Sequence, residues 1–116
     1  MDVHSPEEYS GQRVAPDHLP NEGAQRAGHI PGVHNIPWSL TVDPDQETFL
    51  PADARRALYR AEGITPDQEI VTYCRIGERS AHTWFVLSEL LGFHRARNCD
   101  GSWSEWGGLV KAPIER

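Results

Sequence analysis

The chain has 116 residues, enough for one domain spanning 1–116 that buries roughly two thirds of the surface exposed by its unfolded form. Seventeen acidic and eleven basic residues give a formal net charge of -6, which argues against a nucleic-acid or anionic-membrane partner. No apolar run approaches the ~20 residues of a membrane span and the N-terminus does not resemble a signal peptide, so we expect a cytoplasmic protein. Two cysteines are too few for a disulfide framework, so each is expected to be buried, catalytic or metal-binding.

The first predicted element is a short helix that begins at Pro6. Ser5 is a suitable N-cap and Glu8 completes a capping box, while proline is favoured at the first helical position. Residues 11–27 are polar and contain scattered proline and glycine, which indicates a long surface loop. A short strand is expected around residues 34–36, where the flanking prolines limit its pairing.

The second predicted helix opens at Pro51 and ends at Gly63, which is placed as its C′ residue. Its apolar face is expected to consist of residues spaced at i, i+3, i+4 and i+7, namely Ala54, Ala57, Leu58 and Ala61. Its other face is expected to be solvated and consists of Asp53, Arg55, Arg56, Arg60 and Glu62.

The second half of the chain alternates strand and helix signals. Residues 70–73 are short, apolar and β-rich, as is typical of a central parallel strand. A largely apolar helix is expected from Ala81 to Leu91, with Gly92 after its end, and a brief strand near residues 95–98. Residues 102–105 form a second predicted capping box, which opens a final helix carrying Trp103 and Trp106. The predicted fold class is α/β with a parallel sheet.

The candidate catalytic residue is Cys74, which lies between the predicted strand and the helix that follows it. Backbone N–H groups and the helix dipole stabilise an anion at such a junction. A free cysteine, with a pKa of ~8.5, is only a few per cent thiolate at pH 7, so a nucleophilic cysteine needs such a site. We therefore predict that Cys74 is a nucleophile.

The rest of the loop is predicted to bind the substrate. Gly77 permits a backbone conformation that turns consecutive N–H groups inward, and Ser80 adds a donor. Arg75 and Arg79 offer forked donors to an oxyanion and outnumber Glu78, so we expect a locally cationic loop in an acidic protein. The predicted substrate-binding set is Arg75, Ile76, Gly77, Glu78, Arg79 and Ser80. His82 is left out, because a preformed thiolate needs no general base.

Three segments together resemble the rhodanese family of sulfurtransferases, in the same order: residues 26–37, the Cys74 loop and residues 100–106. The resemblance covers nearly the whole chain and is closest to the catalytic C-terminal domain of two-domain thiosulfate sulfurtransferases. It implies a central parallel sheet flanked by helices, no cofactor, and transfer of sulfane sulfur from thiosulfate through a persulfide on Cys74. The acceptor would be cyanide or a thiol, in a double-displacement mechanism.

Other readings of the loop are less favoured. Cysteine phosphatases and arsenate reductases place five residues between Cys and Arg, whereas four lie between Cys74 and Arg79, which suits one sulfur atom better than a phosphate. Mercaptopyruvate-type sulfurtransferases tend to begin the loop with Cys-Gly. His29 and His34 have no third ligand at a suitable spacing, so no metal site is expected. Cys99 is expected to be a core residue rather than a resolving thiol.

The chain departs from the family pattern at its start. Asp2 and His4 stand where the family usually has Asp-x-Arg, and Met1 falls at the end of the first strand, which we expect to be truncated. A truncated strand would expose a sheet edge, and without a partner domain one wall of the cleft is missing. We expect weak turnover or a homodimer that covers the gap. A persulfide carrier or regulatory module without efficient turnover remains the alternative function.

Overall fold

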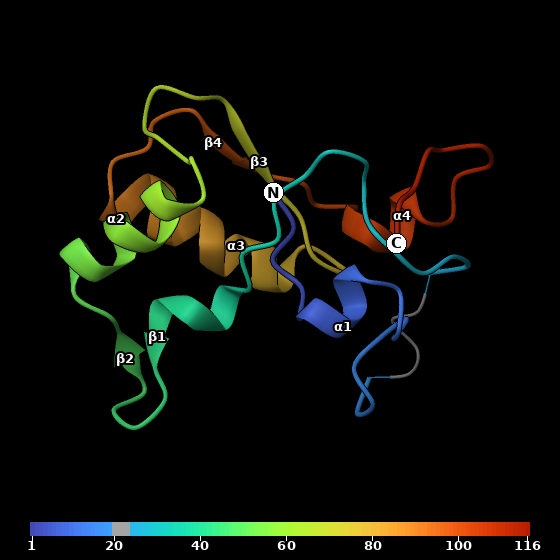
Figure 1. The fold of residues 1–116 in the computed structure, drawn as a ribbon, viewed down its shortest axis with the longest axis horizontal. Coiled ribbons are helices and arrows are strands. Elements are labelled where there is room, and N and C mark those ends of the chain that lie inside the picture. Colours follow the sequence, from blue (N-terminus) through green and yellow to red (C-terminus); the bar gives the residue numbers. More distant parts are fainter. Residues whose placement is uncertain (20–23) are drawn as a thin grey trace.

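The computed structural model describes residues 1–19 and 24–116 (Figure 1). The helical elements are α1 (Pro6–Tyr9), the 3-10 turn η2 (Trp38–Thr41), α2 (Ala52–Ala61), α3 (Glu78–Phe85), the π-helical turn η3 (Val86–Leu90) and α4 (Ser102–Trp106). The strands are β1 (Val42–Asp43), β2 (Thr48–Phe49), β3 (Ile70–Thr72) and β4 (Ala96–Asn98). The loop predicted over residues 11–27 lies partly outside the described residues. No helix within the described part of the chain is long and apolar enough to cross a bilayer.

The predicted parallel sheet is confirmed by the pairing of β3 with β4, in which Ile70 lies opposite Ala96. The chain start extends this sheet, because Asp2 forms parallel bridges to both Tyr73 and Asn35. The strand predicted at residues 34–36 is thus reduced to a single bridge. In Figure 1 the N-terminus lies beside β3, while the antiparallel hairpin of β1 and β2 stands apart from the sheet.

The expectation of an exposed sheet edge at the chain start is wrong. Asp2 donates its N–H to the carbonyl of His34 at 2.8 Å, and Val3 donates to the carbonyl of Tyr73 at 3.1 Å. The segment is therefore hydrogen-bonded on both sides and lies inside the sheet. Asp2 is fully buried, and the Nδ1 atom of His4 lies 2.8 Å from its carboxylate, so a histidine pairs with this aspartate.

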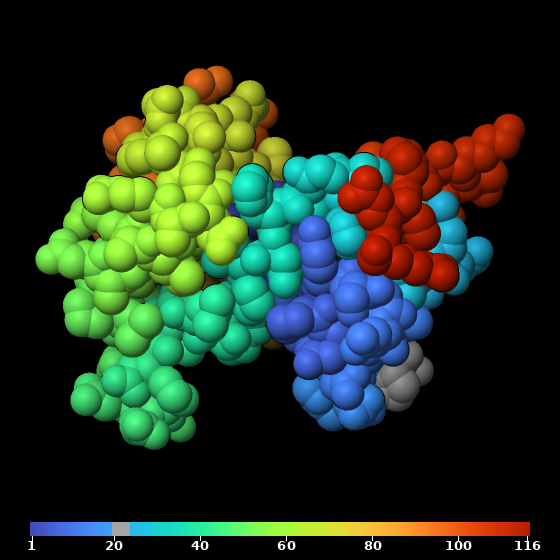
Figure 2. Space-filling model, viewed as in Figure 1, coloured from blue at the N-terminus to red at the C-terminus, as the bar shows by residue number. Residues whose placement is uncertain are grey.

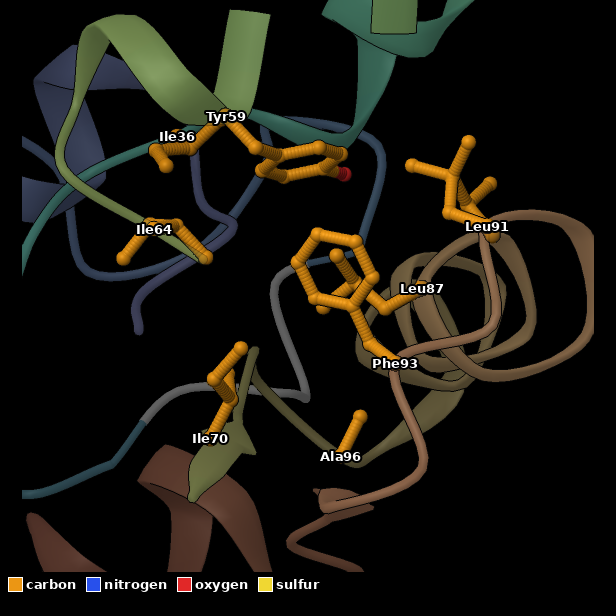
Figure 3. Packing of buried hydrophobic residues seen from close by; sticks show 9 residues of the cluster. Ile36, Tyr59, Ile64, Ile70, Leu87, Leu91, Phe93 and Ala96 are labelled. Atoms are coloured by element: carbon orange, nitrogen blue, oxygen red, sulfur yellow. The ribbon is translucent and has the colours of Figure 1, made fainter. Parts of the chain in front are cut away.

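The hydrophobic core lies between the sheet, α2 and the end of the α3–η3 helix (Figure 3). It contains Ile36, Tyr59, Ile64, Ile70, Val86, Leu87, Leu91, Phe93 and Ala96. These residues come from both halves of the chain, and their burial holds β3 in place. The strand that precedes the Cys74 loop is thereby fixed to the centre of the domain.

The predicted buried face of α2 is wrong at its three alanines, whereas Leu58 is partly buried and packs against the core. Arg55 and Tyr59 are its buried residues, whereas Ala54, Ala57 and Ala61 are exposed. The Tyr59 ring lies 6.5 Å from that of Phe93, and the Arg55 guanidinium lies 5.5 Å over the ring of Phe49. A long side chain with an aromatic partner buries more apolar surface than an alanine methyl group, so the helix turns its larger residues inward.

Helix ends also differ from the prediction. Both groups of the capping box at Ser5 and Glu8 are present, and Gly63 and Gly92 have the left-handed φ expected after a helix. The capping box predicted at Ser102 is wrong, because α4 has Gly101 at its N-cap position and no side-chain cap. Ser102 instead adopts a positive φ of 50° and makes other hydrogen bonds.

Candidate active site

Cys74 lies in the loop between β3 and the start of α3, as predicted. Its side chain is fully buried. Its N–H donates to Ser102 Oγ at 3.2 Å and its carbonyl accepts from the N–H of Trp103 at 2.9 Å. The first turn of α4 therefore fixes the backbone of the candidate nucleophile.

Gly77 has the left-handed conformation that the loop was expected to need, with φ 90°. A Cβ at this position would lie 2.7 Å from the carbonyl oxygen of Asp100, so only glycine fits without a shift. Asn98 of β4 donates its side-chain amide to the Gly77 carbonyl at 3.1 Å. The turn of the loop is thus held by the strand next to β3.

Several backbone donors of the loop have no acceptor among the described residues. Within the described residues, no hydrogen-bond acceptor faces the N–H groups of Ile76, Gly77, Glu78 and Ser80. The Ser80 hydroxyl is buried and also lacks a partner among those residues. N–H groups at the start of a helix point along its axis towards the preceding loop, where they favour negative charge.

Glu8 binds both arginines of the loop. Arg79 forms a bidentate pair with its carboxylate, at 2.9 and 3.0 Å, and Arg75 donates from Nη2 at 3.1 Å. Arg75 is 1% exposed, and its Nε and Nη1 atoms have no acceptor among the described residues. Figure 1 shows α1, which carries Glu8, beside the start of α3.

This pairing corrects the expectation of a locally cationic loop. Burial alone would raise the pKa of Glu8, but hydrogen bonds from Arg79 and Arg75 and the nearby charge of His4 outweigh it and lower the pKa to about 2. Glu8 is therefore ionised at neutral pH. Counted together with Glu78 of the loop, Glu8 makes two carboxylates against two arginines, so the formal charge of the group is balanced.

Sequence reasoning did not assign Glu8 and Ser102 to the site. Both were interpreted only as helix caps, and no local pattern signals a contact between residue 8 and residues 75 and 79. Ser102 accepts from the Cys74 N–H and donates to the Cys99 carbonyl at 2.6 Å. Its positive φ is the kind of backbone strain that folded proteins retain at functional sites.

Cys99 faces away from the loop. Alternation along β3 and β4 directs Thr72 and Asn98 towards Ser80 and Gly77 of the loop. Cys99 instead lines an apolar hollow of about 360 Å³ together with Val71 and Tyr73. It is half-buried rather than a core residue, and it lies on the other face of the sheet from the α3 side.

A second hollow, of about 430 Å³, adjoins the loop at Arg79. Its other walls come from α1 and from η2 with the residues before it, including Pro6, Trp38 and Leu40. Arg79, one of the candidate substrate-binding residues, lines this hollow. We therefore take it as the approach to the loop.

The comparisons with known proteins show the family of the chain. A model of the family described as "Rhodanese-like domain" matches residues 1–109. The chain belongs to this rhodanese-like family. The α/β fold with its parallel sheet agrees with this family, and solved structures superpose on the chain.

Two curated relatives align with all or nearly all of this chain. The sulfur carrier protein TtuD of Thermus thermophilus is 56% identical over 116 residues, which are 100% of this chain and 40% of that relative. A putative thiosulfate sulfurtransferase of Mycolicibacterium smegmatis is 54% identical over 115 residues, covering 99% of this chain and 41% of the relative. The chain thus spans about two fifths of the length of these relatives.

Solved structures show the same fold. An anaerobic ergothioneine biosynthesis enzyme from Chlorobium limicola matches with a TM-score of 0.84 and 26% identity, over 98% of this chain and 27% of that one. The Tum1 protein of Saccharomyces cerevisiae matches with a TM-score of 0.75 and 24% identity, over 98% of this chain and 38% of that one.

Proposed function

We propose that this rhodanese-like domain is a thiosulfate sulfurtransferase with Cys74 as its nucleophile. The Cys74 thiolate attacks the outer sulfur of thiosulfate, the S–S bond breaks, and sulfite leaves with the electron pair. Cyanide or a thiol then takes the terminal sulfur of the Cys74 persulfide, and the thiolate is regenerated. The observation that carries the proposal is the cysteine held at the start of α3 beside backbone donors that have no acceptor among the described residues.

The remaining loop residues have distinct proposed roles. The N–H groups of Ile76, Gly77, Glu78 and Ser80 stabilise the thiolate and persulfide charge, with the Ser80 hydroxyl as a further donor. Arg79 lines the approach and offers its charge to the sulfonate end of the donor. Arg75 is buried, and its Nε and Nη1 atoms have no acceptor among the described residues, so it stabilises the loop and any anion that enters it.

Names of relatives support sulfur chemistry of this kind. Those 54–56% identical are named for thiosulfate sulfurtransfer or sulfur carriage. A solved structure of the neighbour EanB, 25% identical, holds ergothioneine covalently linked with a persulfide. By the same chemistry this domain would need a sulfane donor and a thiophilic acceptor.

Mass spectrometry of the intact protein tests the nucleophile. After incubation with thiosulfate and removal of the excess, the wild type should gain the mass of one sulfur atom. Cys74→Ser should gain none, whereas Cys99→Ser, the matched control, should load as the wild type does. Loading that persists in Cys74→Ser and disappears in Cys99→Ser would show that the wrong cysteine has been assigned.

A persulfide carrier is the second candidate, favoured by the relative named as a sulfur carrier protein. Both candidates load Cys74, so a steady-state assay with thiosulfate and cyanide separates them. Repeated thiocyanate formation supports the sulfurtransferase, whereas loading of Cys74 without appreciable thiocyanate formation supports the carrier. Hydrolysis of an aryl phosphate that depends on Cys74 would contradict both.

A further inference from the structure

A group of aromatic and apolar side chains borders the approach to the loop. We call it the aromatic ledge, formed by Trp38, Leu40, Phe49, His82 and Phe85. The His82 ring lies 5.1 Å from that of Trp38 and 5.2 Å from that of Phe49, and Phe49 stacks on Phe85 at 6.3 Å. Leu40, Phe49 and Phe85 are 48%, 38% and 42% exposed, although all three are large and apolar. Such a contiguous exposed patch is typical of an interaction surface.

The ledge is uncharged at its centre and acidic at its rim. Burial lowers the pKa of His82, which is therefore neutral at pH 7. The hairpin that supplies Phe49 carries Asp43, Asp45 and Glu47, and the sequence has no lysine or arginine from residue 27 to residue 54. The next basic side chain, Arg55, lies over the Phe49 ring, so this single positive charge counters only part of the three negative charges of the hairpin.

The ledge is continuous with the site. Trp38 and Leu40 line the same hollow as Arg79, and His82 lies on α3 one turn beyond the loop. Figure 2 shows the hairpin, in green, standing out from the body of the molecule as a separate lobe. A partner held on the ledge and hairpin would reach the hollow without crossing the rest of the surface.

We propose that the aromatic ledge docks a basic, cysteine-bearing segment of an acceptor protein. An apolar or aromatic side chain of the partner packs on Phe49 and Phe85, and its lysines or arginines face the acidic hairpin. This acceptor class rests on the proposed function. The partner's thiolate attacks the outer sulfur of the Cys74 persulfide, the S–S bond breaks, Cys74 leaves as the thiolate and the partner carries the persulfide.

The negative charge of the hairpin argues against a second copy of this chain as the partner that binds the aromatic ledge. Two ledges facing each other would bring two acidic hairpins together, and the chain as a whole carries a formal charge of -6. Like charges across an interface oppose association, whereas a basic segment is steered towards the ledge.

The binding test needs no sulfur transfer. The probe is a fluorescent peptide with a central tryptophan, four flanking lysines and a terminal serine, and its partner probe has glutamates in place of lysines. Fluorescence anisotropy should show binding of the basic probe, weakened roughly tenfold by the double variant Asp45→Lys/Glu47→Lys and by Phe85→Ser. The acidic probe should bind far more weakly.

The matched controls make the same two kinds of change, a charge reversal and the loss of an apolar side chain, at positions outside the ledge and the hairpin. Asp17→Lys reverses a charge in the loop after α1, a helix that lies away from the hairpin in Figure 1, and Val110→Ser removes an apolar side chain that is 89% exposed. Both should bind the basic probe as the wild type does. Equal binding of the two probes, or equal loss in the controls, overturns the docking proposal.

The transfer test uses the same peptide with a terminal cysteine as acceptor. The ledge variants should lower the rate of transfer to the peptide roughly tenfold while thiocyanate formation from cyanide stays within about twofold. If Cys74 never loads sulfur, the proposed function fails, yet anisotropy still decides whether the ledge binds the basic probe. A wild-type dimer in sedimentation that the ledge variants dissociate overturns the docking proposal.

Discussion

Glu8 has two roles that use the same carboxylate. It completes the capping box of α1 by accepting from the N–H of Ser5 at 3.4 Å, and it holds Arg75 and Arg79 beside the candidate nucleophile. A four-residue helix is too short to be stable by itself. We infer that these ion pairs dock α1 against the loop as much as they order the arginines.

Glu8→Gln is expected to destabilise the protein at neutral pH. The pKa of Glu8 is lowered from 4.5 to about 2, so its ionised form stabilises the fold by about 3 kcal/mol at pH 7. Because the folded-state pKa lies below the unfolded one, this stabilisation is full above about pH 4.5 and is lost as the pH falls towards 2. Urea unfolding of wild type and variant across this range should show the difference shrinking to nothing.

Glu7→Gln is the matched control for Glu8. Glu7 is exposed on the same turn of α1 and contacts neither arginine in any described bond, so its replacement should change the free energy of unfolding by no more than about 0.5 kcal/mol. An equal loss in both variants would mean that the capping charge of α1, rather than the arginine pairing, supplies the stability.

Gly77→Ala should damage the loop more than an ordinary replacement of a left-handed glycine. The positive φ alone costs an alanine about 1–2 kcal/mol, and the new Cβ would also meet the Asp100 carbonyl at 2.7 Å. Gly92→Ala is the control, since its φ is 73° and nothing lies within 4 Å of its Cβ position. We expect slower sulfur loading by intact mass in Gly77→Ala only; equal loading rates in the two variants would contradict the close-packing argument.

At the level of elements, α2 shows how packing overrides an apolar stripe. Its alanines are spaced for a buried face, but the helix buries Tyr59 and Arg55 instead. The Tyr59 hydroxyl is buried and has no partner among the described residues, so burial raises its pKa. Removing that hydroxyl should therefore relieve an unfavourable desolvation while the ring keeps its packing.

Tyr59→Phe is expected to raise the free energy of unfolding by about 1 kcal/mol. Tyr73→Phe is its matched counterpart, because the Tyr73 hydroxyl accepts from the N–H of Ile30 at 3.1 Å. Loss of that acceptor should lower stability by about 1 kcal/mol. Urea denaturation of the two variants tests the contrast, and effects of the same sign in both would show that the two hydroxyls are in equivalent environments.

At the scale of the whole molecule, the pairing of Glu8 with the loop arginines determines how kcat/KM for thiosulfate should depend on salt concentration. With the arginines of the loop balanced, the net charge of -6 should repel thiosulfate at long range. We expect kcat/KM for thiosulfate to rise about two- to threefold as ionic strength increases from about 10 to 100 mM, because salt screens this repulsion. Two salts with different anions serve as the control, and a fall in kcat/KM would mean that local attraction by Arg79 dominates.

Sequence patterns correctly predicted those features of the fold that are determined by residues close together in the chain. The cap at Ser5, the left-handed Gly77, and the strand and helix on either side of Cys74 all follow from residues within a few positions of each other. The Glu8 pair, the buried face of α2 and the inward position of Asp2 could not be predicted in this way. Each depends on contacts between residues far apart in the chain.

The sequence by itself determined where a cysteine would meet the start of a helix, and three ordered segments identified the family. Only the tertiary structure decided what surrounds that cysteine. It brought Glu8 to the arginines, placed Ser102 against the Cys74 N–H, and turned Cys99 to the other face of the sheet. The physical reason is that backbone conformation is set locally, whereas charge balance and burial are set by whichever distant segments the core brings together.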